Sequence, residues 1–194
     1  MKLVAFDLSL ASTGYAILAD KTVSFGTIKC GKERGMERLE AIRKACADIA
    51  LYSEQNHEHS RADLVICEAL AFAAHDLNHE RAGLATLIRH SLWLEHIPYV
   101  LAAPTSLKKF VTGSGKAEKS QMMLAVFQHF KHIPANDNEA DAIGLLYLGR
   151  MLTGELKPET KAQQETLQVI WNSNAEALQQ AGFKQIVAKA KKKK

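Results

Sequence analysis

The stretch that decides the fold is Leu3-Val4-Ala5-Phe6-Asp7-Leu8-Ser9-Leu10-Ala11-Ser12-Thr13-Gly14-Tyr15-Ala16-Ile17-Leu18. Apolar runs at 3–6 and 15–18 flank a turn of small residues, and Asp7 stands where the first run ends. A carboxylate at the end of a buried strand is poorly solvated and needs a counter-charge, which a divalent metal ion commonly supplies. This stretch therefore predicts a pair of strands with a candidate metal ligand between them.

Two further acids occupy comparable positions. Glu68 ends the apolar run at 64–67, which is typical of a strand buried on both faces. Asp141 lies near the start of a helical pattern, where the helix dipole alone favours an acid, so by itself it is weak evidence. Three acids on separate elements predict a site for hard ions such as Mg²⁺ or Mn²⁺. Two such ions about 4 Å apart would hydrolyse a phosphodiester, which is nuclease chemistry.

The order of the expected elements predicts an α/β fold with a mixed sheet. Strands are expected at 3–7, 14–19, 22–29, 64–68 and 99–102. Helices are expected at 33–52, 77–95, 104–110, 116–131 and 137–152. The first three strands follow each other through short turns and should form an antiparallel meander. The later strands alternate with helices, which favours parallel pairing, so the whole is a five-stranded mixed sheet flanked by helices.

The composition limits the number of domains and the cellular compartment that we expect. With 194 residues and 47% apolar content, the chain can bury one sizeable core, which we expect to span residues 1–152. Its three cysteines are an odd number without Cys-x-x-Cys spacing, which indicates reduced residues of a cytoplasmic protein. The first apolar run is too short for a signal-peptide core, and no stretch approaches a membrane span. We therefore expect a soluble, intracellular protein with no membrane partner.

The C-terminal extension at 153–183 carries no strand signal. Apolar residues recur on one helical stripe, at Leu167, Ile170, Trp171, Ala175 and Leu178. The stripe predicts an appended helix that Gly182 ends. An aromatic residue on such a stripe more often packs in the core than stacks on a base, so Trp171 is expected to pack.

The tail at 184–194 carries the positive charge of the chain. The net charge is +4, and six of the 25 basic residues lie in this tail: Lys184, Lys189, Lys191, Lys192, Lys193 and Lys194. Without these six, 19 basic residues face 21 acidic ones, a balance of −2. The tail is either a solubilising disordered end or an arm that binds DNA phosphates.

Several blocks together resemble RuvC-type Holliday junction resolvases. They are the Asp-x-Ser-x-x-x-Thr-Gly pattern from Asp7, the acid Glu68 after its apolar run, Thr112-Gly113-Ser114-Gly115-Lys116-Ala117-Glu118-Lys119-Ser120-Gln121, Ile133-Pro134, and 138–142. Their order and spacing agree with the family over about residues 1–152. The resemblance implies an RNase H-like fold and a homodimer. It also implies paired, symmetric nicking of a four-way DNA junction with Mg²⁺, in DNA recombination and repair.

The resemblance also implies the metal ligands. Asp7, Glu68 and Asp141 fall on the family's metal-binding acids. The fourth family ligand is usually Asp or His, and its position is Asn138 here, which offers a carbonyl oxygen but no charge. Asp137, four residues before Asp141, is within reach as an alternative. Asn138 and Asp137 are therefore both candidates for the fourth ligand.

Five further positions are expected to contact DNA. Lys119 matches a functionally important family lysine, and either Lys108 or Lys109 matches a second basic position. A cation near the scissile phosphate stabilises the charge that develops during phosphoryl transfer, so Lys119 is expected to be catalytic. For Lys116, an ordinary surface lysine is the alternative interpretation. Phe72 falls near the family's aromatic residue at the junction centre, where it would stack on an unpaired base, although a core position is equally suitable.

The sequence thus predicts a Mg²⁺-dependent, structure-selective endonuclease that resolves four-way junctions, a crossover junction endodeoxyribonuclease. Three alternatives compete with it. An actin-like or sugar-kinase-like ATPase would share the pattern from Asp7 to Gly14, but the chain is too short for the duplicated domain of that fold. Asn138 favours a catalytically weakened junction-binding module. An RNase H-like nuclease would instead cut RNA, hybrids or other branched nucleic acids.

Overall fold

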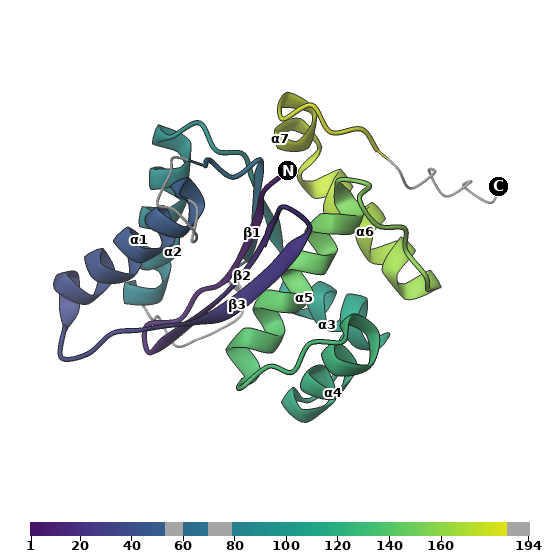
Figure 1. The fold of residues 1–194 in the computed structure, drawn as a ribbon, viewed down its shortest axis with the longest axis horizontal. Coiled ribbons are helices and arrows are strands. Elements are labelled where there is room, and N and C mark those ends of the chain that lie inside the picture. The colour runs from purple at the N-terminus through teal and green to yellow at the C-terminus, as the bar shows by residue number, and fades with distance from the viewer. Residues whose placement is uncertain (53–59, 70–78, 186–194) are drawn as a thin grey trace.

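The computed structural model describes residues 1–52, 60–69 and 79–185 and contains a five-stranded sheet (Figure 1). The strands, in their order across the sheet, are β3 (Thr22–Lys29), β2 (Ser12–Ala19), β1 (Leu3–Asp7), β4 (Leu64–Glu68) and β5 (Tyr99–Ala102). β1, β2 and β3 are antiparallel, whereas β4 is parallel to β1 and β5 is parallel to β4. The predicted mixed sheet is confirmed. β2 begins at Ser12, two residues earlier than expected, because Ser12 still pairs with Lys29.

The meander turns between β2 and β3 at Asp20 and Lys21. Both residues have positive φ angles, 48° and 67°. A two-residue hairpin loop of type I′ needs this left-handed conformation at both positions, since its twist matches that of the strands. The predicted tight turn is therefore present without a glycine.

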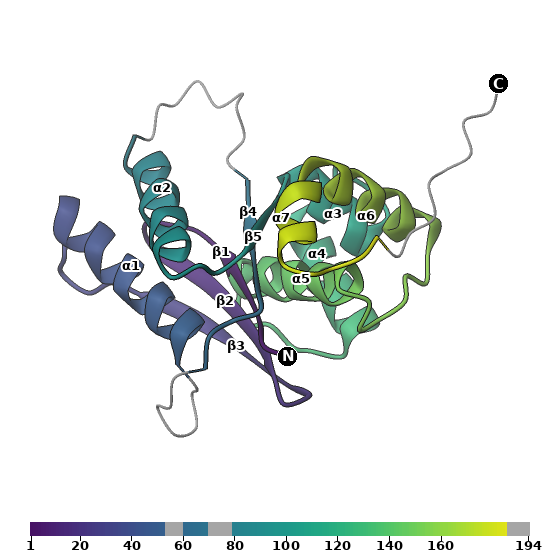
Figure 2. The ribbon, with the colours of Figure 1, turned by 90° about the horizontal axis from the view of Figure 1, so that it is seen from above.

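Seven helices of the described chain cover the two faces of the sheet. They are α1 (Gly35–Leu51), α2 (His79–Leu94), α3 (Pro104–Thr112), α4 (Lys119–Phe130), α5 (Asp137–Leu152), α6 (Lys161–Ser173) and α7 (Ala175–Gln180). Figures 1 and 2 show α1 and α2 on one side of the sheet, with α5 on the other side. The helix expected from 116 begins at Lys119, because Glu118 caps it and Gln121 bonds back to the Glu118 backbone.

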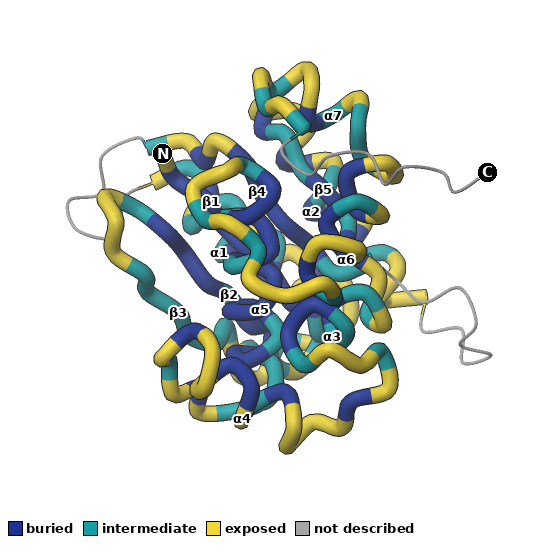
Figure 3. The backbone as a smooth tube through the Cα atoms, turned by 90° about the vertical axis from the view of Figure 1, so that its right-hand side faces the viewer, coloured by how far each residue is buried: buried dark blue, intermediate teal, exposed yellow. Residues whose placement is uncertain are grey.

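Alternate residues of the central strands supply two cores. Leu3 and Ala5 of β1 pack with α3 to α7, whereas Val4 and Phe6 pack with α1 and α2. β1 and β4 are buried almost along their length, as is the core-facing side of α5, whereas β3 at the edge is only half-buried (Figure 3). Successive side chains of a strand point to opposite faces, so Asp7 falls on the same face as Leu3 and Ala5. That face is the one α5 covers.

α6 and α7 interrupt what the sequence predicted as one helix. Asn174, between them, leaves the helical conformation at φ −128° and ψ 19°. Its side-chain oxygen accepts a hydrogen bond from the Leu101 backbone N–H at 3.0 Å, and its side-chain nitrogen donates to the Leu101 carbonyl at 3.2 Å. The amide thereby satisfies part of the open edge of β5, which a continuous helix would not do. Trp171 is buried in the core, as predicted.

Within the residues that the structure describes, no helix has the length and apolar character needed to cross a bilayer. Cys30, Cys46 and Cys67 are free thiols, as the sequence predicted.

Candidate metal centre

The three predicted acids converge. One ligand oxygen from each of Asp7, Glu68 and Asp141 lies within 4.8 Å of the others. β1 and β4 are parallel neighbours, with Phe6 opposite Cys67, so the carboxyl ends of both strands lie at the same edge of the sheet. Glu68 shares the parity of Leu64 and Ile66, which pack toward α5, and Asp7 shares that of Leu3 and Ala5. Strand pairing and alternation therefore direct both side chains toward the start of α5.

The start of α5 lies directly on the backbone of β2. Gly14 pairs with Asp7, and a Cβ atom at position 14 would stand only 2.1 Å from the Asn138 carbonyl oxygen. Any side chain there would push the helix away from the sheet. Asn136 caps the helix, because its side-chain oxygen accepts a hydrogen bond from the Glu139 N–H at 2.9 Å. These contacts bring Asp141 to the two strand acids.

Burial and mutual repulsion make the three carboxyl groups hard to ionise together. Burial, followed by the charges of Glu68 and Asp141, raises the pKa of Asp7 to about 8. Burial and the neighbouring Asp141 raise the pKa of Glu68 to about 7, and burial with the charge of Asp137 raises the pKa of Asp141 to about 6. A divalent cation that prefers oxygen ligands would remove this penalty. The donor set therefore fits such an ion.

Three cations from neighbouring helices act on this cluster: Arg81, Lys108 and, at Asp141, Lys119. Burial raises the pKa values of Asp7 and Glu68, and the charge of Arg81 on α2 opposes that rise. Lys108 on α3 opposes it in the same way at Glu68 and Asp141. Arg81 was missed in the sequence, where its only signal is a basic residue early in the helix after Glu68. The edge that gathers the acids thus also has positive charge around it.

Comparisons with known proteins agree with this geometry. The RuvC crossover junction endodeoxyribonuclease of Caldicellulosiruptor saccharolyticus is 26% identical over 161 residues, which cover 75% of this chain and 89% of the relative. That of Carboxydothermus hydrogenoformans is 27% identical over 164 residues, 80% of this chain and 99% of the relative. The chain therefore resembles RuvC proteins over about three quarters of its length. No protein-family model matches it.

Solved structures give the same result for the fold. Thermus thermophilus RuvC superposes with a TM-score of 0.59 at 18% identity, covering 78% of this chain and 96% of that one. T. thermophilus RuvC in complex with a Holliday junction substrate also gives a TM-score of 0.59, over 75% of this chain and 90% of that one. The RuvC-like, RNase H-like fold predicted from the sequence is confirmed.

The two candidates for a fourth ligand differ in their surroundings. Asp137 accepts a hydrogen bond from the Lys119 ammonium group, and this contact lowers the pKa of Asp137. Its charge is therefore already compensated. Asn138 lies against Gly14 on β2, in the same first turn of α5 as Asp137. The acids that cluster are Asp7, Glu68 and Asp141, without Asp137.

The other predicted DNA-contacting residues are spread more widely. Lys109 forms an ion pair with Glu165 of α6 at 2.7 Å, whereas the charge of Lys108 acts on the acid cluster. Lys116 is exposed in the turn before α4, and the Lys119 side chain is 81% exposed. Phe72 and Lys191 to Lys194 lie outside the described residues.

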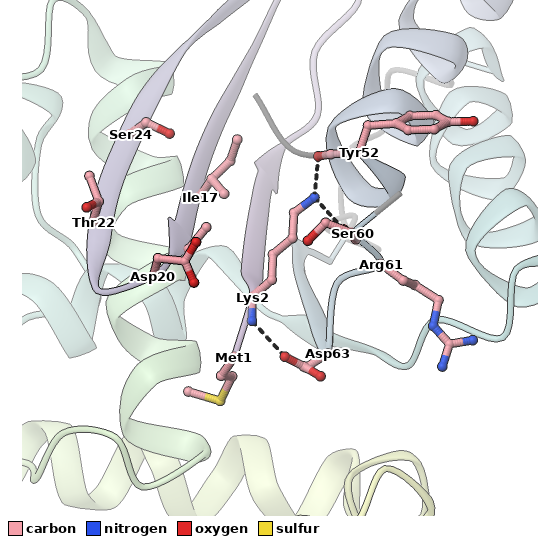
Figure 4. A pocket seen from close by; sticks show the side chains of 11 residues that line it. Met1, Lys2, Ile17, Asp20, Thr22, Ser24, Tyr52, Ser60, Arg61 and Asp63 are labelled. Atoms are coloured by element: carbon pink, nitrogen blue, oxygen red, sulfur yellow. Dashed lines mark hydrogen bonds between the residues drawn. The ribbon is translucent and has the colours of Figure 1, made fainter. Parts of the chain in front are cut away.

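A cavity of about 370 Å³ lies at the opposite end of β1, away from the acids (Figure 4). Lys2 lies along it, with its ammonium nitrogen donating to the backbone carbonyls of Tyr52 at 2.6 Å and Ser60 at 2.8 Å. The Lys2 backbone N–H donates to Asp63 at 2.6 Å. These bonds join β1 to the chain on both sides of residues 53–59. The cavity contains none of the three clustered acids.

Proposed function

We propose that this protein is a divalent-metal-dependent, structure-selective DNA endonuclease that resolves four-way junctions by paired, symmetric nicks. The observation that carries the proposal is the convergence of three carboxylates from β1, β4 and α5 in a RuvC-like fold. The relatives supply the substrate class, since they are crossover junction endodeoxyribonucleases. One solved structure holds such a protein on a Holliday junction substrate.

Asp7, Glu68 and Asp141 are the residues that would hold the metal. Their buried, closely spaced oxygen donors suit Mg²⁺, with Mn²⁺ as the substitute. When bound, two such ions supply an activated water and stabilisation of the leaving oxygen in phosphodiester hydrolysis. Asn138 is the better candidate for the fourth ligand, since the Asp137 carboxylate is engaged by Lys119. An amide oxygen adds a ligand without adding charge.

The cations around the acids would position the DNA. Lys119 extends from the first residue of α4 into solvent and is tethered by Asp137, so its ammonium group can meet a phosphate beside the acids. Lys108 and Arg81 flank the cluster from α3 and α2. Positive groups near a scissile phosphate stabilise the charge that develops in the transition state. We propose Lys119 as catalytic, and Lys108 and Arg81 as phosphate-contacting residues.

The proposed active unit is a homodimer. One acid cluster can attack one phosphodiester, whereas resolution of a junction needs two matched cuts. A two-fold symmetric substrate suits a two-fold symmetric protein, with one site facing each strand to be cut. Sedimentation of the protein bound to a junction should therefore give two chains per junction, and a single chain that makes paired cuts would contradict this.

The test is cleavage of an end-labelled four-way junction with and without Mg²⁺, beside linear duplex DNA and an RNA–DNA hybrid. The expected result is metal-dependent nicks at symmetric positions on two opposed strands of the junction alone. Asp7→Asn provides a matched protein that binds but does not cut. Junction binding without metal-dependent cleavage would support a weakened binding module. Cleavage confined to the hybrid would instead indicate a ribonuclease.

A further inference from the structure

We infer that Glu139 is a positioning residue for the metal centre: through Thr27 on β3 it fixes the first turn of α5, and with it Asp141. The inference rests on the proposed function of the acid cluster. Glu139 is only 8% exposed. One carboxylate oxygen accepts hydrogen bonds from the Thr27 hydroxyl at 2.8 Å and the Asn136 amide at 3.4 Å. The other accepts one from the Ala135 N–H at 2.8 Å.

Thr27 lies level with the acid cluster on the sheet. Asp7 pairs with Gly14, and Gly14 pairs with Thr27, so these three residues form one rung across β1, β2 and β3. Paired neighbours on adjacent strands point to the same face, and here that face carries α5. A bond from α5 to Thr27 therefore fixes the helix relative to the strand end that carries Asp7.

Glu139 and Asp141 act on opposite sides of the helix. They are two residues apart, about 200° around the helix axis. The Asn138 carbonyl lies above Gly14 between them, Glu139 bonds to β3, and Asp141 meets the acids of β1 and β4. A rotation of α5 about its axis would move Asp141 away from the acids and break the bond to Thr27. The Thr27–Glu139 bond opposes this rotation.

This contact is more than an ordinary helix cap. In a capping box, the third residue of the helix bonds back to the backbone of the capping residue. α6 has this arrangement: the Thr160 hydroxyl accepts from Gln163, and the Gln163 side chain accepts from the Thr160 N–H at 3.1 Å. In α5 the corresponding side chain, Glu139, instead bonds to Ala135 and to a different strand. A cap stabilises its own helix, whereas a bond to β3 also sets where the helix lies on the sheet.

The two helices allow a matched experiment with the same chemical change. Thr27→Val and Thr160→Val each replace one hydroxyl by a methyl group of similar shape. Metal affinity is measured without DNA, by calorimetric titration of the full chain with Mg²⁺ and Mn²⁺, and thermal unfolding is measured in EDTA. Both variants should unfold at a lower temperature than the natural protein. Only Thr27→Val should bind the metal more weakly, by about 10-fold, as is common when a partner that orients a metal ligand is lost.

Two further variants sharpen the test. Thr27→Ser keeps the hydroxyl and should restore metal affinity. Glu139→Gln keeps the length of the side chain but replaces one accepting oxygen with a donor, so its affinity should fall as in Thr27→Val. In cleavage, both weak variants should need more Mg²⁺ for half-maximal rate while recovering most of the rate at saturating metal.

The outcomes separate this inference from the proposed function. Unchanged metal affinity in Thr27→Val and Glu139→Gln, with affinity intact in the natural protein, would overturn the positioning role alone. An equal loss in Thr27→Val and Thr160→Val would also overturn it, because the effect would then follow stability. Absence of metal binding in the natural protein would contradict the proposed function itself and the positioning role with it.

Discussion

A buried ionisable side chain lies at each end of β1, Lys2 directly before the strand and Asp7 as its last residue, and their surroundings are opposite. Lys2 and Asp7 are both 6% exposed. The Lys2 ammonium group donates to two backbone carbonyls, at 2.6 and 2.8 Å. Asp7 instead faces two other carboxyl groups, and burial together with their charges raises its pKa to about 8. One buried charge has acceptors around it, and the other has like charges.

This difference separates a structural site from one that we propose to be functional. A buried charge that is hydrogen-bonded on several sides can hold chain segments together, as Lys2 does between β1 and the residues flanking 53–59. A cluster of buried like charges is unfavourable without a cation, so a protein keeps it where binding or catalysis needs it. The cavity of about 370 Å³ lies beside Lys2, yet the electrostatics favour the other end of the strand as the metal site.

The largest expected effect is the loss of cleavage in Asp7→Asn. This change removes the charge of the most buried acid in the cluster and keeps its shape. We expect the rate of metal-dependent junction cleavage to fall by roughly 10²- to 10³-fold, the range for loss of one preorganised electrostatic contact. Gel-shift titration should show junction binding unchanged. Asp48→Asn on the exposed side of α1 is the control, and an equal loss of cleavage there would remove Asp7 from the proposed site.

Lys2→Met should act at the other end of β1 on stability instead. The partly buried carbonyls of Tyr52 and Ser60 would lose their donor, and a polar group left unsatisfied away from water costs free energy. We expect the free energy of unfolding to fall by roughly 2–4 kcal/mol, as measured by urea denaturation. The Mg²⁺ dependence of cleavage below the unfolding transition should not change. Lys44→Met at an exposed position of α1 should leave stability almost unaltered.

The same contrast predicts a pH dependence in the metal-free protein. The folded-state pKa values of Asp7, Glu68 and Asp141 are raised to about 8, 7 and 6. Unfolded carboxyl groups release their protons near pH 4, so between about pH 4 and 8 the folded state binds more protons than the unfolded chain. The contribution of these three groups to stability should therefore be largest below that window and fall as the pH rises through it. Urea unfolding in EDTA across this range measures the fall, and saturating Mg²⁺ should reverse it.

Asp7→Asn should reduce this pH dependence, because it removes the ionisation with the highest pKa in the cluster. Above pH 8 without metal, the variant should be more stable than the natural protein by roughly 1–2 kcal/mol. The inactive protein would thus be the more stable one. A variant that loses stability at every pH would show that Asp7 is compensated in the fold, as Lys2 is.

Local sequence patterns were enough to predict most of the fold and the convergence of the acids. Short continuous apolar runs bounded by turns gave the strands. An acid at the end of each of two parallel neighbours must then reach the same edge of the sheet. The contacts missed are those between residues distant in sequence. Asn174 ends α6 by bonding to a residue 73 positions away, and Glu139 bonds to Thr27 across 112 positions. Neither partner has a local signature.

The position of Arg81 could not be predicted for a related reason. A helical pattern shows which face is apolar, but it does not show which end of the helix reaches a site on another element. Arg81 comes near Asp7 and Glu68 because α2 packs across the face of the sheet opposite α5, with its first turn toward the acid edge. Likewise, the pattern placed Asp137 and Asn138 in one helical turn but not beside Lys119.

The smallest effect is expected at Asp137. Unlike the three clustered acids, Asp137 has a hydrogen-bonding partner of opposite charge, and in having a partner it resembles Lys2. Asp137 is paired with the exposed Lys119, and exposed ion pairs contribute little to stability. Asp137→Asn should therefore leave the unfolding transition unchanged and, unlike Asp7→Asn, should not increase stability at high pH. Because Lys119 loses its tether, cleavage should fall by less than about 10-fold at saturating Mg²⁺. The Mg²⁺ concentration for half-maximal cleavage should stay constant in Asp137→Asn and rise in Asn138→Ala. The reverse order would make Asp137 the fourth ligand, which would require Lys119 to release it when the metal binds.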